Sequence, residues 1–137
     1  MMFTPIAKAA VASYADHLDP LLAKMAARSG GRYTAEHLYD GLAEGRCWLA
    51  GIDGWRGAAI LQAHNWPTGL NELDVLGVAG EGLREWVEAV VELESIARKL
   101  NFHRLSAPHA RIGWVPFALK HGWRKAGVIL EKELFRG

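Results

Sequence analysis

The clearest hydrophobic pattern in the chain runs from Leu70 to Leu105. Residues 73–78 are mostly apolar, which predicts a strand with both faces largely covered. The pattern breaks at the Ala-Gly-Glu-Gly sequence of residues 79–82. From Glu85 to Leu100, apolar residues recur at spacings of three and four, which predicts one amphipathic helix. A second strand is expected at residues 103–107, so the whole unit is predicted to be a right-handed strand–turn–helix–strand crossover. The turn before such a helix commonly binds ligands.

Two helices are expected before this unit. Asp19 and Pro20 form a typical helix start, with Asp as the cap and Pro at the first helical position. A pair of glycines at residues 30–31 is expected to end that helix. Thr34 caps a second predicted helix, which runs through Ala43.

A hairpin is predicted between these helices and the central strand. Residues 47–52 form its first strand, and residues 56–64 return. The Asp-Gly pair at residues 53–54 is typical of a two-residue hairpin turn. The Trp-Pro-Thr-Gly sequence of residues 66–69 makes the next turn. The alanine-rich residues 7–15 are compatible with either a helix or a short edge strand.

The C-terminal part is predicted to add a short helix at residues 114–121 and a final strand at residues 128–135. The order of elements predicts an α/β (α+β) fold, in which one mixed sheet has helices on both faces. With 137 residues, the chain is expected to be a single domain (residues 1–137) that buries a core without disulfides or a structural metal.

The net charge of the chain is +1, which argues against nucleic-acid binding by general electrostatics. The charges are nevertheless uneven. Residues 72–94 carry almost only acidic side chains, with Arg84 as the one base, and residues 98–125 carry bases without any acid. Two interpretations remain open: two solvated faces of opposite sign, or a local basic rim for a phosphorylated ligand.

Cys47 is the only cysteine, so the chain has no internal disulfide, which fits a reducing compartment. A small core residue is favoured over a catalytic thiol, because no paired histidine or helix start is evident beside it. The sequence shows neither a signal-peptide pattern nor an apolar run of membrane-spanning length. We therefore expect a cytoplasmic protein without a membrane partner.

Glu72 and Asp74 are the candidate catalytic residues. Side chains two positions apart on a strand share a face, so the two can form a coupled carboxylate pair. The alternative is that one of them caps a strand end in water. The six histidines show no metal-ligand spacing on one element, so no metal site is expected. His109 and Arg111 precede the last helix and are either site residues or ordinary loop residues.

Tryptophan is frequent in this sequence, with six residues. Trp48 and Trp86 fit the apolar pattern of their predicted strand and helix, so both are expected in the core. Trp55 and Trp66 lie at predicted turns and are expected to be exposed. Exposed tryptophans often anchor interfaces, so a homo-oligomer is one expectation.

The C-terminal third resembles a known family. Residues 114–123 (Trp-Val-Pro-Phe-Ala-Leu-Lys-His-Gly-Trp) are similar to the last helix and Gly-Phe step of the GNAT superfamily of N-acetyltransferases, with Trp123 in the aromatic place. Residues 127–134 are similar to its closing strand. The order of elements extends this resemblance over most of the chain, and implies a GNAT-like mixed, mostly antiparallel central sheet. The paired N-terminal helices, the Gly-Trp at residues 113–114 and the ending also resemble a GNAT-like branch of bacteriophages and prophages.

The resemblance implies a ligand, acetyl-CoA or another acyl-CoA, and an amine acceptor on a small molecule or a protein. In the family, a glycine-rich turn and the following helix N-terminus bind the pyrophosphate. The corresponding residues of this chain are Val78, Ala79, Gly80, Gly82, Arg84 and Arg111.

The chain also departs from the family pattern. Arg84 and Trp86 occupy two positions at which the family's turn has small residues, usually glycine. The Trp86 indole would crowd the pyrophosphate there, whereas the Arg84 guanidinium could bind it. Arg111 occupies the position of an Asn that the family often has before its last helix. Ala118 occupies the position of the Tyr that serves as general acid, and alanine can transfer no proton. Two functions follow: an N-acyltransferase with divergent motifs, or a non-catalytic phage-derived structural or interaction protein that retains the fold.

Overall fold

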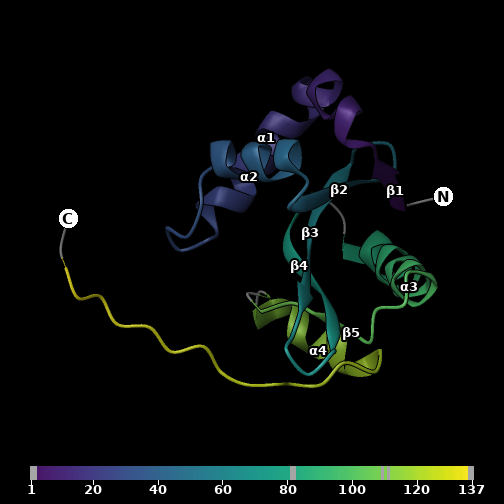
Figure 1. Cartoon of the computed structure of the whole chain (residues 1–137), viewed down its shortest axis with the longest axis vertical. Coiled ribbons are helices and arrows are strands. Elements are labelled where there is room, and N and C mark those ends of the chain that lie inside the picture. Colours follow the sequence, from purple (N-terminus) through teal and green to yellow (C-terminus); the bar gives the residue numbers. More distant parts are fainter. Residues whose placement is uncertain (1–2, 81–82, 109, 111, 136–137) are drawn as a thin grey trace.

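The computed structural model describes residues 3–80, 83–108, 110 and 112–135, and only the backbone of residues 83–87 and 112. Its described part contains a five-stranded sheet with the order β1-β2-β3-β4-β5 (Figure 1). The strands are β1 (Phe3–Ile6), β2 (Cys47–Ile52), β3 (Gly57–Asn65), β4 (Asn71–Gly80) and β5 (Arg104–Ser106). Neighbouring strands from β1 to β4 are antiparallel, and β5 joins β4 in parallel.

Helices cover both faces of this sheet, as predicted. The helical elements are η1 (Lys8–Tyr14), α1 (Ala15–Ala27), α2 (Ala35–Glu44), α3 (Leu83–Lys99), η2 (Ile112–Trp114) and α4 (Val115–Lys120). In Figure 1, α1 and α2 lie on one side of the strands and α3 lies on the other. The prediction of one continuous helix between the parallel strands is confirmed.

Two hydrophobic cores result from the alternation of side chains along the strands. Leu49 and Ile60 point toward α1 and α2, whereas their neighbours Ala50 and Leu61 point toward α3. The first core buries α1 residues completely or nearly so, namely Leu18, Leu21, Leu22 and Met25. The second core buries one stripe of α3, namely Ala89, Leu93 and Ala97.

The first helix begins earlier than predicted. α1 starts at Ala15, directly after the 3-10 turn of η1, and Pro20 lies inside it. Burial of Leu18 explains the extra turn, because this residue extends the apolar stripe toward the N-terminus. Asp19 is not a cap, since its carboxylate accepts a hydrogen bond from the Tyr39 hydroxyl of α2.

The second helix and the hairpin were predicted with different success. Thr34 caps α2 by accepting a hydrogen bond from the His37 amide at 3.2 Å, and Gly45 ends the helix with φ of 78°. The hairpin exists, but Ile52 pairs with Gly57. Its loop therefore has four residues (53–56) rather than two, and β3 begins at Gly57.

The predicted final strand is absent from the described structure. Residues 123–135 contain neither helix nor strand, and Figure 1 shows them as an extended yellow segment that leaves the body of the protein after α4. A strand requires a neighbour that pairs with its backbone N–H and C=O groups. The prediction of a final strand at residues 128–135 is therefore wrong for the part of the chain that the structure describes, where no strand pairs with this segment.

Candidate functional site

The two parallel strands at the edge of the sheet separate after a short contact. Glu72, Leu73 and Asp74 of β4 pair with Arg104, Leu105 and Ser106 of β5, and the ladder ends there. β4 continues for six more residues, to Gly80. Within the described ladder, residues 75–80 therefore have a partner strand on the β3 side only.

A cleft of about 600 Å³ lies beside this part of β4. Such a volume is typical of a small-molecule site. One wall is β4 itself, and another is α3 through Ala89, Val90 and Leu93. The segment that follows β5 contributes a third wall, with Ala107, Ala110, Gly113, Trp114 and Trp123. The end of α1 and the loop after it contribute the cleft's polar groups, namely Arg28, Ser29, Arg32 and Tyr33.

A β-bulge shapes β4 at the centre of the cleft. Leu61 faces Val75 and Ile60 faces Gly77, so Leu76 has no counterpart in the β3–β4 register. Bulges redirect side chains and free backbone groups, and they are frequent beside active sites. Here, the Leu76 carbonyl accepts a hydrogen bond from the Tyr33 hydroxyl at 3.3 Å.

Close packing at the bulge also favours glycine at position 77. A Cβ atom there would lie 3.0 Å from the Met25 sulfur and 3.1 Å from the Tyr33 hydroxyl oxygen. The end of α1 and the following loop therefore approach β4 closely at this point. Burial raises the pKa of Tyr33 above its ordinary value, so its hydroxyl is protonated at neutral pH and donates its one proton to the Leu76 carbonyl.

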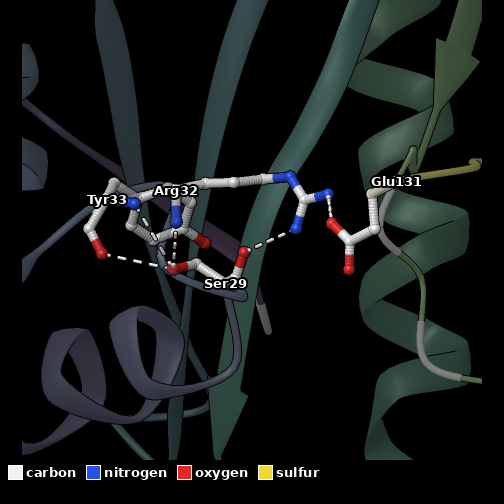
Figure 2. Close-up of polar contacts among 4 residues, drawn as sticks. All are labelled: Ser29, Arg32, Tyr33 and Glu131. Atoms are coloured by element: carbon white, nitrogen blue, oxygen red, sulfur yellow. Dashed lines mark hydrogen bonds and ion pairs between the residues drawn. The ribbon is translucent and has the colours of Figure 1, made fainter. Parts of the chain in front are cut away.

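The loop that carries Tyr33 is held by the buried Ser29 (Figure 2). The Ser29 hydroxyl donates to the Ala26 carbonyl at 2.8 Å and accepts from the backbone amides of Arg32 and Tyr33 at 3.2 and 3.3 Å. Arg32 Nη1 donates to the Ser29 carbonyl at 2.9 Å, and its Nη2 pairs with the Glu131 carboxylate at 2.7 Å. The Arg32 guanidinium at the cleft is thus paired with the Glu131 carboxylate of the C-terminal segment.

Asp74 lies at the last paired position of β4 and is buried, with 7% of its surface exposed. Its carboxylate accepts a hydrogen bond from the Ser106 hydroxyl of β5. His64 Nε2 of β3 lies 2.7 Å from its other oxygen. Three strands therefore hold this carboxylate, and the side chain of His64, which is 42% exposed, connects it to solvent.

Glu72 lies on the same face but has different partners. Trp66 Nε1 donates to Glu72 Oε1 at 3.1 Å, and Arg104 Nη1 lies 3.7 Å from Oε2. Only 12% of the Glu72 side chain is exposed, so neither candidate carboxylate caps a strand end in open water. Each is instead bound by separate neighbours, and the two belong to one polar cluster on β3, β4 and β5.

The predicted site residues are placed as follows. Val78, Ala79 and Gly80 line the cleft. Glu72 and Asp74 do not line it, although Asp74 directly precedes the lining residue Val75. Other predicted or discussed residues, or their side chains, lie outside the described residues: Gly82, His109 and Arg111, and the side chains of Arg84 and Trp86.

Sequence reasoning missed the loop between α1 and α2. Ser29, Arg32 and Tyr33 contribute polar groups to the cleft, yet the glycine pair beside them was interpreted only as a helix end. Their proximity to β4 depends on how α1 packs on the sheet, which no local motif reveals. A polar Arg-Tyr pair directly before the Thr34 cap was the one available signal.

Several other predictions can be compared with the structure. Trp48 was expected in the core but is 43% exposed; it lies on the α3 side of β2, where its ring contacts Phe102 at the edge of the second core. Trp55 was expected to be exposed but packs against Tyr14 and His17. Trp66 is 49% exposed, as predicted.

Cys47 is buried, and burial raises the pKa of its thiol while the neighbouring Arg46 opposes the shift. This environment suits a core residue better than a nucleophile. Among the residues that the structure describes, no cluster of three His, Cys, Asp or Glu side chains could hold a metal ion. Within the same part of the chain, no helix has the length and apolar character needed to cross a membrane.

Comparison with known proteins gives no match to a protein-family model and no match among curated proteins. Solved structures do match. A probable acetyltransferase has a TM-score of 0.68 and 14% identity, over 100% of this chain and 99% of the other. A ribosomal-protein-alanine N-acetyltransferase from Brucella melitensis biovar Abortus 2308 has a TM-score of 0.60 and 17% identity, over 95% and 100% of the two chains. A predicted acetyltransferase from Clostridium acetobutylicum, solved with acetyl-CoA, has a TM-score of 0.62 and 16% identity, over 98% and 97%.

These identities are low, and the coverage of both chains is nearly complete. The likeness therefore concerns the fold, which for this chain is the sheet order and helix placement described above. This chain has the GNAT acetyltransferase fold, a mixed and mostly antiparallel sheet with helices on both faces.

Proposed function

We propose that this protein binds an acyl-CoA in the cleft beside β4 and transfers the acyl group to an amine. The observation that carries the proposal is the unpaired side of β4 over residues 75–80, which borders an apolar cleft. The arm of coenzyme A contains amide groups, and amides can hydrogen-bond to an open strand edge as a further strand would. The Clostridium neighbour was solved with acetyl-CoA, which supports this choice of ligand.

The phosphate end of the ligand would lie at the N-terminus of α3. This helix begins at Leu83, three residues along the chain from the end of β4 at Gly80. The first turn of a long helix offers backbone N–H groups and a partial positive charge to an anion. Gly82, Arg84 and Arg111 remain the predicted additional contacts.

In the proposed reaction, the amine nitrogen attacks the thioester carbonyl carbon, a C–N bond forms and the C–S bond breaks. The proton lost by the amine goes to the Asp74 carboxylate, directly or through one water. His64, which contacts Asp74 at 2.7 Å, can pass that proton to solvent. The leaving thiolate needs a proton in return.

Tyr33 is our candidate for that proton donor. Ala118 of α4, at the place of the family's acid, is buried and carries no transferable proton. The Tyr33 hydroxyl lies at the bulge in the cleft and is protonated at neutral pH. To act as the acid, it would exchange its hydrogen bond to the Leu76 carbonyl for one to the leaving sulfur.

Binding can be tested by calorimetric titration with acetyl-CoA. An Ala110→Trp variant should weaken or abolish binding, because Ala110 lines the cleft from an exposed position and its enlargement fills the cleft without disturbing the core. Ala43→Trp is the matched control: it adds the same side chain at an exposed position of α2 away from the cleft. A flat titration of the unmodified protein at millimolar ligand would refute the proposal.

The role of Asp74 can be tested separately by the acetylation rate of a panel of amines. Asp74→Asn should lower kcat by roughly 10²-fold or more, as expected for loss of a general base, and should leave acetyl-CoA binding intact. Glu72→Gln is the matched control, since it neutralises the neighbouring carboxylate on the same face. Equal losses in both variants would assign the effect to the folding of the cluster rather than to proton transfer.

The second candidate function is a binding protein that keeps the fold without transferring an acyl group. Ala118 favours it, because the usual acid is missing. Binding of acetyl-CoA together with no acetylation of any amine would support this alternative and remove the catalytic proposal.

A further inference from the structure

A second cavity lies beside the loop that carries Tyr33. Its volume is about 310 Å³. Arg32, Tyr33 and Leu76 line both this cavity and the cleft beside β4. The rest of its lining comes from α2, from residues around the start of β2 and from Gln62 of β3. The two cavities therefore share a wall at the bulge of β4, where the Tyr33 hydroxyl donates to the Leu76 carbonyl.

Asp74, the proposed base, lies on the face of the sheet that borders this second cavity. Gln62 is directly opposite Cys47 of β2 and directly opposite Asp74 of β4. Residues that are directly opposite project from the same face, with Cβ atoms about 4.5–5.5 Å apart. Because Gln62 and Cys47 line the second cavity, the Asp74 side chain is adjacent to it. An amine in this cavity can therefore approach the proposed base.

Arg32 is the cation that the two cavities share. Its backbone amide donates to the Ser29 hydroxyl at 3.2 Å, and its Nη1 donates to the Ser29 carbonyl at 2.9 Å. A Cβ atom at Gly30 would lie 2.6 Å from this Nη1, so glycine at position 30 leaves room for the guanidinium. These contacts orient the guanidinium and leave Nη2 for a further partner, as Figure 2 shows.

The partner of this nitrogen within the chain is a carboxylate. Glu131 Oε2 lies 2.7 Å from Arg32 Nη2, and the two side chains are 66% and 36% exposed. Glu131 belongs to a segment without helix or strand, and ion pairs at exposed positions are weak. A carboxylate from a bound molecule can therefore replace Glu131 at the same nitrogen, where guanidinium and carboxylate have matching geometry.

The other charged groups leave Arg32 as the best anchor for an anion. Among the described residues that line the cleft, Arg28 and Arg32 carry charge and no acid accompanies them. In the second cavity, Arg46 pairs with Glu44 at 2.6 Å and shares the wall with the carboxylate of Asp40. The charge of Arg46 is thus balanced by its own neighbours.

Arg32 is also distant from the proposed phosphate site at the start of α3. The loop after α1 reaches β4 at Leu76, whereas α3 begins beyond the end of the strand at Gly80. Four residues of strand span about 13 Å. Arg32 therefore lies near the reacting end of the proposed acyl-CoA, and an anion that it binds belongs to the acceptor.

We propose that the acyl acceptor is a small amine that also carries a carboxylate, such as a free amino acid, and that Arg32 binds this carboxylate in place of Glu131. The inference rests on the function proposed above and names the substrate class of the same site. Asp74 and Leu76 are two residues apart on β4, about 6–7 Å, so the two ends of one small molecule can lie near the base and near the bulge. A cavity of about 310 Å³ has the size of a small-molecule site.

Paired acceptors test the proposal. Acetyl-CoA consumption is measured with the standard free amino acids and with their amides, in which a neutral group replaces the carboxylate. The best free amino acid should have a kcat/KM at least about 10-fold above that of its amide, as expected for a hydrogen bond between charged groups. The amide has the less basic amine and more free base at neutral pH, so intrinsic reactivity opposes this preference. Equal rates, or faster acetylation of the amides, would overturn the inference and leave the acyltransferase proposal standing.

Substitutions locate the carboxylate. Arg32→Gln should remove the preference for acids over amides. Lys24→Gln is the control, since it removes a positive charge from the last turn of α1 outside both cavities. Glu131→Gln should lower KM for the acids severalfold more than for the amides, because it removes the internal competitor, whereas Glu133→Gln in the same segment should not. A preference that survives Arg32→Gln, or a KM unchanged by Glu131→Gln, would contradict the proposal.

Direct titration separates this inference from the acyltransferase proposal. If no amine is acetylated, the catalytic proposal fails, and the carboxylate site is tested by calorimetric titration of the amino acids into the unmodified protein and Arg32→Gln. Binding that Arg32→Gln abolishes would support the site without the reaction. Absence of binding to the unmodified protein would overturn the site as well.

Discussion

At the scale of single residues, the contact between Gly41 and Cys47 fixes how α2 lies on β2. A Cβ atom at Gly41 would lie 2.9 Å from the Cys47 sulfur and 3.6 Å from its Cβ. The first distance is a clash and the second is an ordinary contact. Glycine is therefore required at position 41 only as long as position 47 carries the thiol.

A double-mutant cycle tests this contact. Gly41→Ala should be more destabilising in the natural background than in Cys47→Ala by about 1–3 kcal/mol, the usual cost of overpacking. The gain in helix propensity from alanine, about 1 kcal/mol, is the same in both backgrounds and cancels. Urea unfolding of the four proteins gives the coupling energy, and additivity within about 0.5 kcal/mol would contradict the clash.

Tyr39 provides a pH-dependent prediction at the same scale. Burial, together with the hydrogen bond and charge of Asp19, raises the pKa of Tyr39 to about 12 from 10.0. The unfolded chain ionises first as the pH rises, so the contribution of Tyr39 to stability is complete below pH 10 and is lost between about 10 and 12.

Ultraviolet titration of phenolate absorbance, compared with that of Tyr39→Phe, measures this pKa. Asp19→Asn should lower it only partly toward 10, because burial is the larger cause. A Tyr39 that ionises near pH 10 in the folded protein would refute the assignment.

The two acidic site candidates show what a sequence reveals about single residues. The period of two correctly placed Glu72 and Asp74 on one face. Their partners could not be predicted, because Ser106 reaches Asp74 only through the parallel register of β5, 32 residues away. The contact of His64 depends on the β3–β4 register between the bulge and the turn, in which His64 faces Glu72 and lies diagonally opposite Asp74.

At the scale of elements, α1 is the helix that the sequence predicted least well. Pro20 was assigned to its first position, where proline is favourable. In the structure, it lies inside the helix, where it removes the hydrogen bond that the carbonyl of residue 16 would accept. The buried stripe of α1 outweighs this local preference.

Pro20→Ala should therefore stabilise the protein by about 1–3 kcal/mol, by restoring an internal hydrogen bond at a position where proline is unfavourable. Pro116→Ala is the matched control, since Pro116 lies in the first turn of α4 and has no such hydrogen bond to lose. Both variants gain similar freedom in the unfolded state, so the difference between their urea midpoints isolates the helix effect. A loss of stability in Pro20→Ala would indicate that the proline instead begins the helix.

Other elements were predicted well wherever local chemistry decides their ends. The capping box of Thr34 and His37 and the left-handed Gly45 fix both ends of α2. The turn after β3 closes through the bond from the Trp66 amide to the Leu70 carbonyl at 2.9 Å. The final strand failed for a different reason, since pairing depends on a partner that the pattern of a single segment does not specify.

At the scale of the whole molecule, the mixed sheet with helices on both faces was predicted from the sequence, whereas strand β1 and the cleft were not. Its walls come from β4, α3, the loop after α1 and the segment after β5. These segments are distant in sequence, and the opening exists because β5 leaves β4 after three pairs. No periodicity encodes the length of a ladder.

The shortness of that ladder has a consequence for how the protein can change over time. Strands β1 to β4 carry both hydrophobic cores, whereas β5 adds three residue pairs. Substitutions downstream of Arg104 are therefore expected to change the lining of the cleft while both hydrophobic cores stay intact. The cleft wall after β5 is the part of the molecule in which sequence drift would disturb folding least.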